Sequence, residues 1–195
     1  MARTVQADKA ILAAARELVA RRPASEVSME AVAAAAGFSR QAIYRHFGSR
    51  AGLLTALLAS IDEVEGAREQ VEHVLAAATG RACLERLVAW WTDYVPRFVG
   101  TARGVLAAKH ADADLRVAWD DRMRALHDVG RAVAERCRAD GTLAPDLSPA
   151  EAADALWALL SVPLWIQLRE DAGWSAERYR EHTTALAVAR LVGPP

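Results

Sequence analysis

The 195-residue chain is poor in cysteine, phenylalanine and tyrosine, with two, three and three residues, and it has no long hydrophobic run. Cys83 and Cys137 are too few and too isolated for a disulfide framework or a tetrahedral zinc site, so we expect two buried thiols. The longest apolar stretch, 155–168, is interrupted by polar residues and a proline, whereas a membrane-spanning helix needs roughly 18 to 20 apolar residues. The first ten residues also lack the apolar run of a signal peptide. We therefore expect a cytoplasmic protein without a membrane partner.

Alanine is abundant, with 44 residues, and apolar residues make up 53% of the chain. Alanine has the highest helix propensity, whereas strands favour aromatic and β-branched side chains. A chain of this length and apolar content can form one or two compact domains with a hydrophobic core. The composition therefore predicts an all-α protein.

The net charge of −1 conceals an uneven distribution. Residues 1–50 carry eight basic and four acidic side chains, a balance of +4, and the remaining residues carry 16 basic and 21 acidic side chains. A basic segment before a mildly acidic one is typical of a DNA-binding head joined to a regulatory body. A solvated helix face would give the same balance, so a motif is needed to decide between them.

Apolar residues recur at helical spacing along most of the chain, and Gly, Pro and capping residues interrupt the pattern. The pattern predicts about nine helices, at 6–21, 28–36, 39–47, 50–74, 81–98, 102–110, 113–139, 149–171 and 175–191. Ser148 and Glu151 have the spacing of a capping box, with Pro149 at the first helical position, which is a specific start signal. Pro163 lies inside the eighth predicted helix and is expected to kink it.

The segment 28–47, SMEAVAAAAGFSRQAIYRHF, has the pattern of a helix-turn-helix. Gly37 supplies the permissive backbone of the turn, and apolar residues pack the second helix onto the first. On a helical wheel, Gln41, Tyr44 and Arg45 then fall within an arc of roughly 100° on the opposite side. These side chains suit a major groove, because Arg can donate two hydrogen bonds to guanine, Gln can bond adenine and Tyr can reach a phosphate or a thymine methyl. Two small helices of an ordinary bundle are the alternative.

At these residues the chain resembles the TetR family of transcriptional regulators. The resemblance covers about the first 58 residues, from KAILAAARELVA through SMEAVAAAAGFSRQAIYRHFGSRAGLL, and AIYRHFGSRAGLL is its most specific part. The resemblance implies a three-helix DNA-binding head with a helix-turn-helix at 1–49, joined to a ligand-binding and dimerisation bundle at 50–195.

The resemblance also implies roles for individual positions. The expected DNA-binding residues are Ser28, Ser39, Arg40, Gln41, Ala42, Tyr44, Arg45, His46 and Arg50. Positions 40–42 match those that usually face bases. The matches to positions that usually hold the phosphate backbone are Ser28, Tyr44, His46 and Arg50, while Arg45 can reach either.

The sequence departs from the family pattern at the start of the fourth predicted helix. Most relatives have Lys where Arg50 stands, which preserves the charge, and commonly an acid followed by Ala where this chain has Ala51 and Gly52. Glycine costs roughly 1 kcal/mol of helix propensity relative to alanine. The first turn of this helix is therefore expected to be soft.

The mechanism that the resemblance implies is geometric. A two-fold homodimer holds two recognition helices about 34 to 36 Å apart, so both enter successive major grooves of a palindromic operator in double-stranded DNA. A small-molecule effector in the body favours a conformation with a different spacing, and the repressor leaves the operator. The last two predicted helices, 149–171 and 175–191, are rich in Ala and Leu and are expected to pair with those of the partner.

Aromatic side chains in the body are candidates for the walls of a ligand cavity. The expected ligand-binding residues are Trp91, Tyr94, Phe98, Trp119, Met123, Trp157, Leu160 and Trp165. Such residues suit an apolar, aromatic or polycyclic effector, although each of them fits the hydrophobic core equally well.

No pattern in the sequence points to catalysis, a cofactor or a metal ion. It contains no Gly-rich phosphate loop, no nucleophile elbow and no Glu-x-x-His pairs. His110, Asp112 and Asp114 could ligate a metal, but no second pair of ligands accompanies them. We therefore expect a regulator rather than an enzyme, and the alternative is a helical-bundle enzyme or small-molecule carrier that does not bind DNA.

Overall fold

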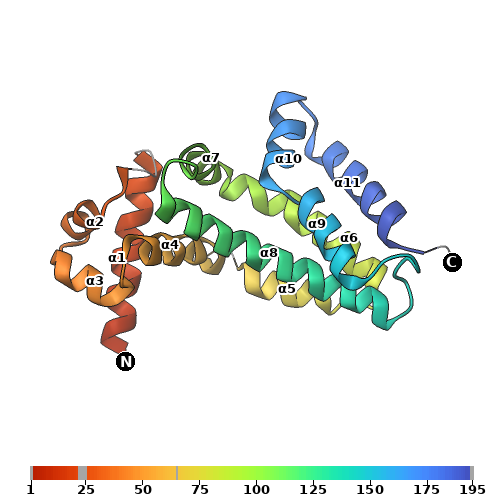
Figure 1. Ribbon diagram of the computed structural model, residues 1–195, viewed down its shortest axis with the longest axis horizontal. Coiled ribbons are helices and arrows are strands. Elements are labelled where there is room, and N and C mark those ends of the chain that lie inside the picture. Colours follow the sequence, from red (N-terminus) through yellow and green to blue (C-terminus); the bar gives the residue numbers. More distant parts are fainter. Residues whose placement is uncertain (1, 22–25, 65, 194–195) are drawn as a thin grey trace. The chain divides into compact units, whose positions relative to one another are not determined.

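The computed structural model describes residues 2–21, 26–64 and 66–193. Within these ranges the chain forms 11 α-helices and no strand, which confirms the predicted all-α class (Figure 1). The helices are α1 (Ala2–Arg21), α2 (Met29–Ala36), α3 (Arg40–Phe47), α4 (Arg50–Val64), α5 (Ala67–Leu75), α6 (Gly80–Tyr94), α7 (Val99–Ala108), α8 (Ala113–Ala139), α9 (Pro149–Leu159), α10 (Val162–Ile166) and α11 (Ala176–Leu191). A 3-10 turn at Val95–Arg97 follows α6, and a π-helical turn at Gln167–Asp171 follows α10. None of the described helices is both long and apolar enough to cross a membrane.

Two of the nine predicted helices are each divided, which accounts for the two additional helices. The predicted helix 50–74 forms α4 and α5, and Gly66 lies directly before α5 with a φ of 66°. This left-handed backbone cannot continue an α-helix, and glycine adopts it without a steric cost. Gly66 therefore ends the helical run that the apolar spacing alone predicts as continuous.

The second division lies at Leu160, between α9 and α10. The hydroxyl of Ser161 accepts a hydrogen bond from the amide of Leu164 at 3.4 Å and so caps α10. Pro163 lies in the first turn of α10, where an amide N–H has no intrahelical acceptor and its loss costs nothing. The expected kink at Pro163 is therefore wrong: the helix stops before this proline and starts again around it.

The capping box predicted at the start of α9 is confirmed. The hydroxyl of Ser148 accepts a hydrogen bond from the amide of Glu151 at 3.3 Å, and the Glu151 carboxylate accepts one from the amide of Ser148 at 2.8 Å. The Ser148 hydroxyl also donates to the Glu151 carboxylate at 2.7 Å, and this bond, followed by the one from the Ser148 amide, holds the pKa of Glu151 below its usual value.

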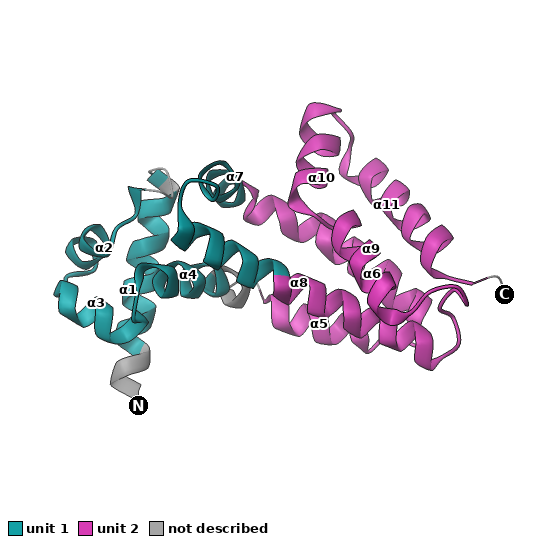
Figure 2. Cartoon of the chain, in the orientation of Figure 1, with its two compact units in different colours: residues 1–64, 100–123 teal, residues 65–99, 124–195 magenta. Residues whose placement is uncertain are grey.

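The chain divides into two compact units (Figure 2). The first unit contains residues 1–64 and 100–123, and the second contains residues 65–99 and 124–195. The predicted domain boundary after residue 49 stays a prediction.

The core of the first unit is formed by one side of each of its first four helices. Ile11 of α1, Val32 of α2, Ile43 of α3 and Leu53 of α4 have no exposed surface. Burying a side chain of this size contributes roughly 1.5 to 3 kcal/mol, so this cluster holds the short helices α2 and α3 against α1 and α4.

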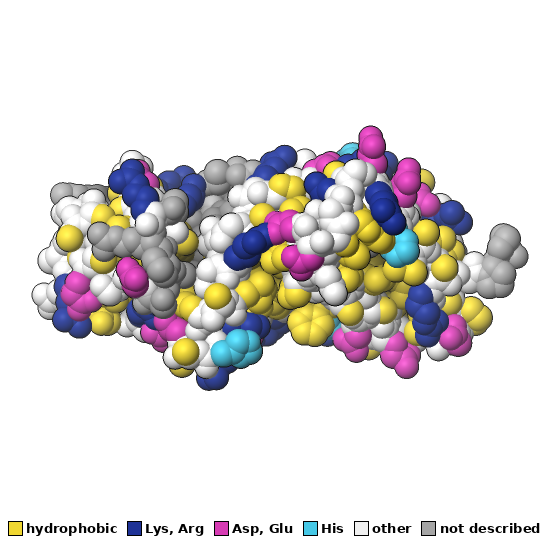
Figure 3. Space-filling model, turned by 90° about the horizontal axis from the view of Figure 1, so that it is seen from above, with side chains coloured by type: hydrophobic (Ala, Val, Ile, Leu, Met, Phe, Trp, Pro, Cys, Tyr) yellow, Lys and Arg dark blue, Asp and Glu magenta, His cyan; other side chains and the backbone are white. Residues whose placement is uncertain are grey.

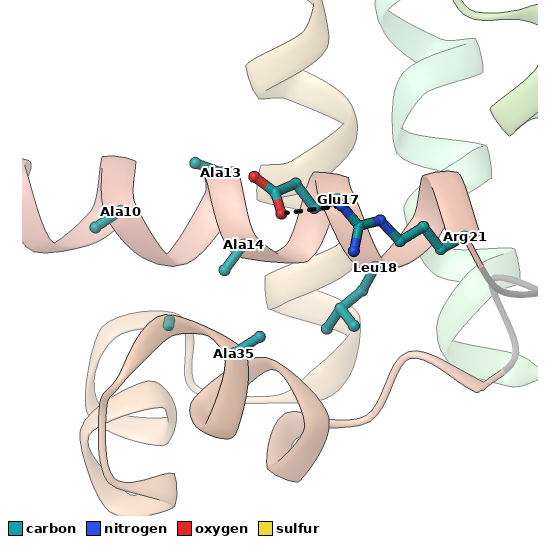
Figure 4. Close-up of a pocket in the computed structure, with 8 residues that line it drawn as sticks. Ala10, Ala13, Ala14, Glu17, Leu18, Arg21 and Ala35 are labelled. Carbon is teal, nitrogen blue, oxygen red and sulfur yellow. Dashed lines mark ion pairs between the residues drawn. The ribbon is translucent and has the colours of Figure 1, made fainter.

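Helix α1 packs against α2, and a hollow remains between them (Figure 4). Its walls are mostly the methyl groups of alanines, and the Glu17 and Arg21 side chains form an ion pair of 3.9 Å at its edge. The lining residues are Ala10, Ala13, Ala14, Glu17, Leu18, Arg21, Ala35 and Ala36. Small side chains on both helices permit this close packing.

In the second unit, α6 packs along α11, and both contribute fully buried side chains. Gly80, at the start of α6, lies so close to α8 that a Cβ there would overlap the backbone of Cys137. Its amide also donates a hydrogen bond of 2.5 Å to the carboxylate of Asp140. Cys83 and Cys137 are buried free thiols, as predicted, and burial raises the pKa of each.

Candidate nucleic-acid interface

Two glycines, Gly37 after α2 and Gly48 after α3, and two serines set the ends of these helices. The Ser28 hydroxyl accepts from the amide of Ala31 at 3.1 Å and caps α2, and the Ser39 hydroxyl accepts from the amide of Ala42 at 3.1 Å and caps α3. Gly37 has a φ of 72° and lets the chain turn between the two helices. These local signals produce the helix-turn-helix geometry that the sequence predicts.

The recognition helix α3 has one buried side and one exposed side. Ile43 is fully buried, whereas Gln41, Tyr44 and Arg45 are exposed, as the helical wheel predicts. Ala42 is half-buried. No hydrogen bond or ion pair to another described residue holds the side chain of Arg45. The structure therefore leaves this polar face available to a ligand, and its contact with DNA stays a prediction.

Arg40 is held within the helix-turn-helix by neighbouring side chains. Its Nε lies 2.8 Å from the carboxylate of Glu30 on α2, and its guanidinium lies 5.4 Å from the centre of the Tyr44 ring. The hydrogen bond to the Tyr44 hydroxyl, followed by the charge of Glu30, raises the pKa of Arg40. This pair is exposed, so water and ions screen it and a base or phosphate can replace Glu30.

His46 lies at the end of α3 and contacts α1. Its Nδ1 lies 2.5 Å from Oδ1 of Asp8, and only 11% of its side chain is exposed. A histidine that the resemblance assigns to the phosphate backbone therefore also fixes the position of the recognition helix.

Arg50, which the resemblance also assigns to a phosphate, is engaged within the protein. Its Nη1 donates to both carboxylate oxygens of Asp112 at 2.9 Å and to Asp114 at 3.4 Å. Its Nε donates to the backbone carbonyl of Val27 at 2.7 Å. The Arg50 and Asp112 side chains are each only 18% exposed. In this structure the guanidinium joins the segment before α2 to the start of α8.

Sequence reasoning missed Asp8, Asp112 and Asp114 as part of this surface. Asp8 is 38 residues from His46, and Asp112 is 62 residues from Arg50, so no helical spacing relates them. The sequence alone indicates Asp112 and Asp114 only as candidate metal ligands. The one available signal was the need of α8 for a capping carboxylate, which Asp112 meets by accepting from the amide of Leu115 at 3.2 Å.

Three of the predicted ligand-binding residues form one aromatic cluster in the second unit. The Phe98 ring lies 5.0 Å from that of Tyr94 and 6.1 Å from that of Trp91, measured between centroids. Leu160 and Trp165 are also buried in this unit, whereas Trp157 is 43% exposed. Trp119 and Met123 are buried in the first unit.

Several polar atoms in the second unit are buried without a hydrogen-bond partner among the described residues. They are Nε1 of Trp91, Nε1 of Trp165, the hydroxyl of Tyr179 and Nε of Arg180. Tyr94 also lines a hollow of about 190 Å³, together with Gln70, Trp90, Asp93 and Arg97. Unpaired buried donors are costly and are often found where a ligand or water supplies the acceptor.

Comparison with known proteins identifies the head. Residues 11–57 match the family model described as bacterial regulatory proteins, tetR family. This match confirms the resemblance seen in the sequence over these residues. No curated protein matches the chain.

Solved structures share the fold over nearly the whole chain. A TetR-family transcriptional regulator from Rhodococcus sp. has a TM-score of 0.73 at 24% identity, covering 93% of this chain and 96% of its own. A transcriptional regulator from Saccharomonospora viridis, solved with choline, has a TM-score of 0.70 at 24% identity and covers 97% and 100%. The TetR-family repressor FadR from Thermus thermophilus, solved with lauroyl-CoA, has a TM-score of 0.68 at 20% identity and covers 93% of each chain.

Proposed function

We propose that this chain, whose residues 11–57 belong to the tetR family, is a ligand-responsive transcriptional repressor that binds double-stranded DNA. The observation that carries the proposal is the two-sided recognition helix α3, with Ile43 fully buried and Gln41, Tyr44 and Arg45 exposed. The family match favours this function over a helical-bundle enzyme or carrier.

The exposed face of α3 has the chemistry that a major groove requires. Arg45 presents a planar donor that suits guanine, and Gln41 can both donate to and accept from adenine. Arg40 and Tyr44 contact each other, because the guanidinium of Arg40 lies beside the Tyr44 ring and donates to its hydroxyl at 3.4 Å. The capping hydroxyls of Ser28 and Ser39 mark two helix N-termini, where backbone amides favour phosphate.

A homodimer is the expected form on a palindromic operator. Leu186 of α11 is 45% exposed and Trp157 of α9 is 43% exposed, and these two helices contact each other in the second unit. Hydrophobic side chains also reach the surface between charged ones (Figure 3). A second copy of the chain packed on α9 and α11 would cover Trp157 and Leu186. A palindromic operator requires a dimer, with two recognition helices one turn of DNA apart.

The effector is expected to be a small molecule with a large apolar part. The cluster of Trp91, Tyr94 and Phe98 offers aromatic surface, and the buried Nε1 of Trp91 offers a donor without an acceptor. One structural neighbour was solved with lauroyl-CoA, which carries a long apolar chain, and another with choline, a small cation. Such a ligand releases DNA only through different affinities for the two conformations, typically with about 1 to 3 kcal/mol of coupling.

The test is a selection of random duplexes bound by the purified protein, followed by titration of the selected duplex at several salt concentrations. Tyr44→Ala and Arg45→Ala are expected to weaken binding without loss of the fold, because both side chains are exposed. Arg131→Ala, an exposed arginine of the second unit, is the matched control for loss of one positive charge. Unchanged binding by both α3 variants would contradict the proposal.

A further inference from the structure

Arg50 occupies a position that suits phosphate contact, yet its charge is met inside the protein. One nitrogen, Nη1, donates to both oxygens of Asp112 at 2.9 Å and to one oxygen of Asp114 at 3.4 Å. The net charge of these three side chains is −1. Arg50 without the two aspartates would present a charge of +1 to DNA. Carboxylate and phosphate bind a guanidinium through the same planar donor geometry, so they are alternative partners of Arg50.

We propose that Asp112 and Asp114 act as internal counter-ions that compete with the DNA phosphates for Arg50 and so set the strength of operator binding. The inference rests on the proposed DNA-binding function. It assigns a positioning role to two aspartates that lie outside the helix-turn-helix, at the start of α8.

The position of Asp112 is fixed by the backbone on both sides. Its carboxylate accepts from the amides of Asp114 at 3.1 Å and Leu115 at 3.2 Å, which caps α8. Its own amide donates to the carbonyl of Ala108, at the end of α7, at 3.0 Å. Any shift of the turn between α7 and α8 therefore changes the distance from Asp112 to Arg50.

The pair remains within reach of solvent. Asp114 is 42% exposed, and both aspartates line an open hollow together with Ala108, Ala111 and Ala113. Hydrogen bonds from Arg50 and from the two backbone amides outweigh the effect of burial and lower the pKa of Asp112, so it stays ionised at neutral pH. A negatively charged phosphate can therefore approach and exchange with a carboxylate that keeps its charge.

The experiment uses Asp112→Asn, which removes the charge but keeps a side-chain oxygen to cap α8. Binding of the selected duplex is measured by fluorescence anisotropy between 50 and 200 mM KCl. The variant is expected to bind more tightly than the wild type. Each Arg50 that gains a phosphate should steepen the slope of log K against log salt by about 0.9. With two Arg50 side chains in the proposed homodimer, the gain at 50 mM should exceed that at 200 mM by about 12-fold.

Two further variants show whether the effect passes through Arg50. Asp114→Asn leaves the cap of α8 intact and is expected to give a smaller change in the same direction. In an Arg50→Gln background, Asp112→Asn should no longer tighten binding, because the guanidinium for which carboxylate and phosphate compete is absent. Asp120→Asn, an exposed carboxylate elsewhere on α8, controls for the change in net charge.

The outcomes separate the two proposals. If the wild type binds no duplex at low salt, the proposed function fails and the inference fails with it. If the wild type binds and the folded Asp112→Asn and Asp114→Asn variants bind equally or less tightly, only the inference is overturned. An equal gain in Asp120→Asn, or a gain that persists without Arg50, also overturns it.

Discussion

Nδ1 of His46 lies 2.5 Å from Oδ1 of Asp8, so the last turn of α3 is tied to α1 across 38 residues of sequence. Only 11% of the His46 side chain is exposed, against 38% of Asp8. This contact fixes the recognition helix at its C-terminal end, while the buried Ile43 fixes its centre. Gln41 and Arg45 are left at the surface.

Loss of the Asp8 carboxylate is expected to loosen this attachment. Asp8→Ala leaves Nδ1 of His46 without its partner and should lower the free energy of unfolding by about 1 kcal/mol, a usual value for one such hydrogen bond. Urea unfolding followed by circular dichroism measures the change. Asp8→Asn keeps an acceptor oxygen and should lose less. Equal stability of Asp8→Ala and the wild type would show that the contact contributes nothing.

Close packing explains why glycine stands at position 52, which the sequence alone does not show. A Cβ at this position would overlap the backbone carbonyl oxygen of Phe47, because the first turn of α4 folds back on the end of α3. The amide of Gly52 also donates to the capping hydroxyl of Ser49 at 3.0 Å. Glycine is therefore required by close approach, whereas sequence reasoning expected only a soft helical turn.

Gly52→Ala is expected to destabilise the protein, although alanine has the better helix propensity by about 1 kcal/mol. The overlap with Phe47 has to be relieved by moving backbone, which costs more than this gain. Gly104→Ala is the matched control, since a Cβ there meets nothing within 4 Å in α7. Thermal unfolding should show a lower Tm for Gly52→Ala and a higher one for Gly104→Ala. A higher Tm in both would contradict the close approach.

Local signals in the sequence account for most of the fold and for the shape of the candidate site. The hydrogen bonds that cap α2 and α3 join residues no more than four positions apart, at Ser28, Gly37 and Ser39. The order of residue types along the sequence is therefore enough to predict them. The partners of His46 and Arg50 lie 38 and 62 residues away. Such pairs depend on tertiary packing, and no sequence spacing encodes them.

The divided helices show a second limit of sequence reading. Apolar spacing runs unbroken past Gly66, and only the backbone conformation of that residue shows that the helix stops. At Pro163, the same residue type is compatible with a kink or with a new first turn, and the cap at Ser161 decides between them. Ser161, two residues before Pro163, is a helix-start signal related to Ser148, which directly precedes Pro149.

Leu186 tests the proposed subunit contact. Leu186→Glu places a charge on the exposed face of α11 and should shift a dimer toward monomers, because burying an unpaired carboxylate at an interface is unfavourable. Sedimentation velocity over a concentration series measures the shift. Val117→Glu is the control for adding a charge. Val117 is 52% exposed but belongs to the first unit, whereas α9 and α11 belong to the second. A mass unaffected by Leu186→Glu would place the dimer contact elsewhere.

Tyr179 of α11 couples stability to alkaline pH. Its ring is fully buried, and burial raises the pKa of the phenol to about 12, against the smaller opposing effects of Thr183 and Trp91. In the unfolded chain a tyrosine ionises near pH 10. Because the folded pKa is the higher one, the contribution of Tyr179 is fully present below pH 10 and is lost as the pH rises from 10 to 12.

Tyr179→Phe removes this ionisation and also removes a hydroxyl that lies near Thr183 and Trp91 but makes no hydrogen bond of normal geometry with a described residue. The variant should be about as stable as the wild type at pH 9, since losing an unpaired hydroxyl costs little. Between pH 9 and pH 11 the wild type should lose about 1.4 kcal/mol more of its unfolding free energy than the variant, from the difference in the two pKa values. Urea titrations of both proteins at the two pH values measure this difference. Equal losses of stability in the two proteins would mean that water reaches the phenol of Tyr179 in the folded protein. The burial of Tyr179 would then be incorrect.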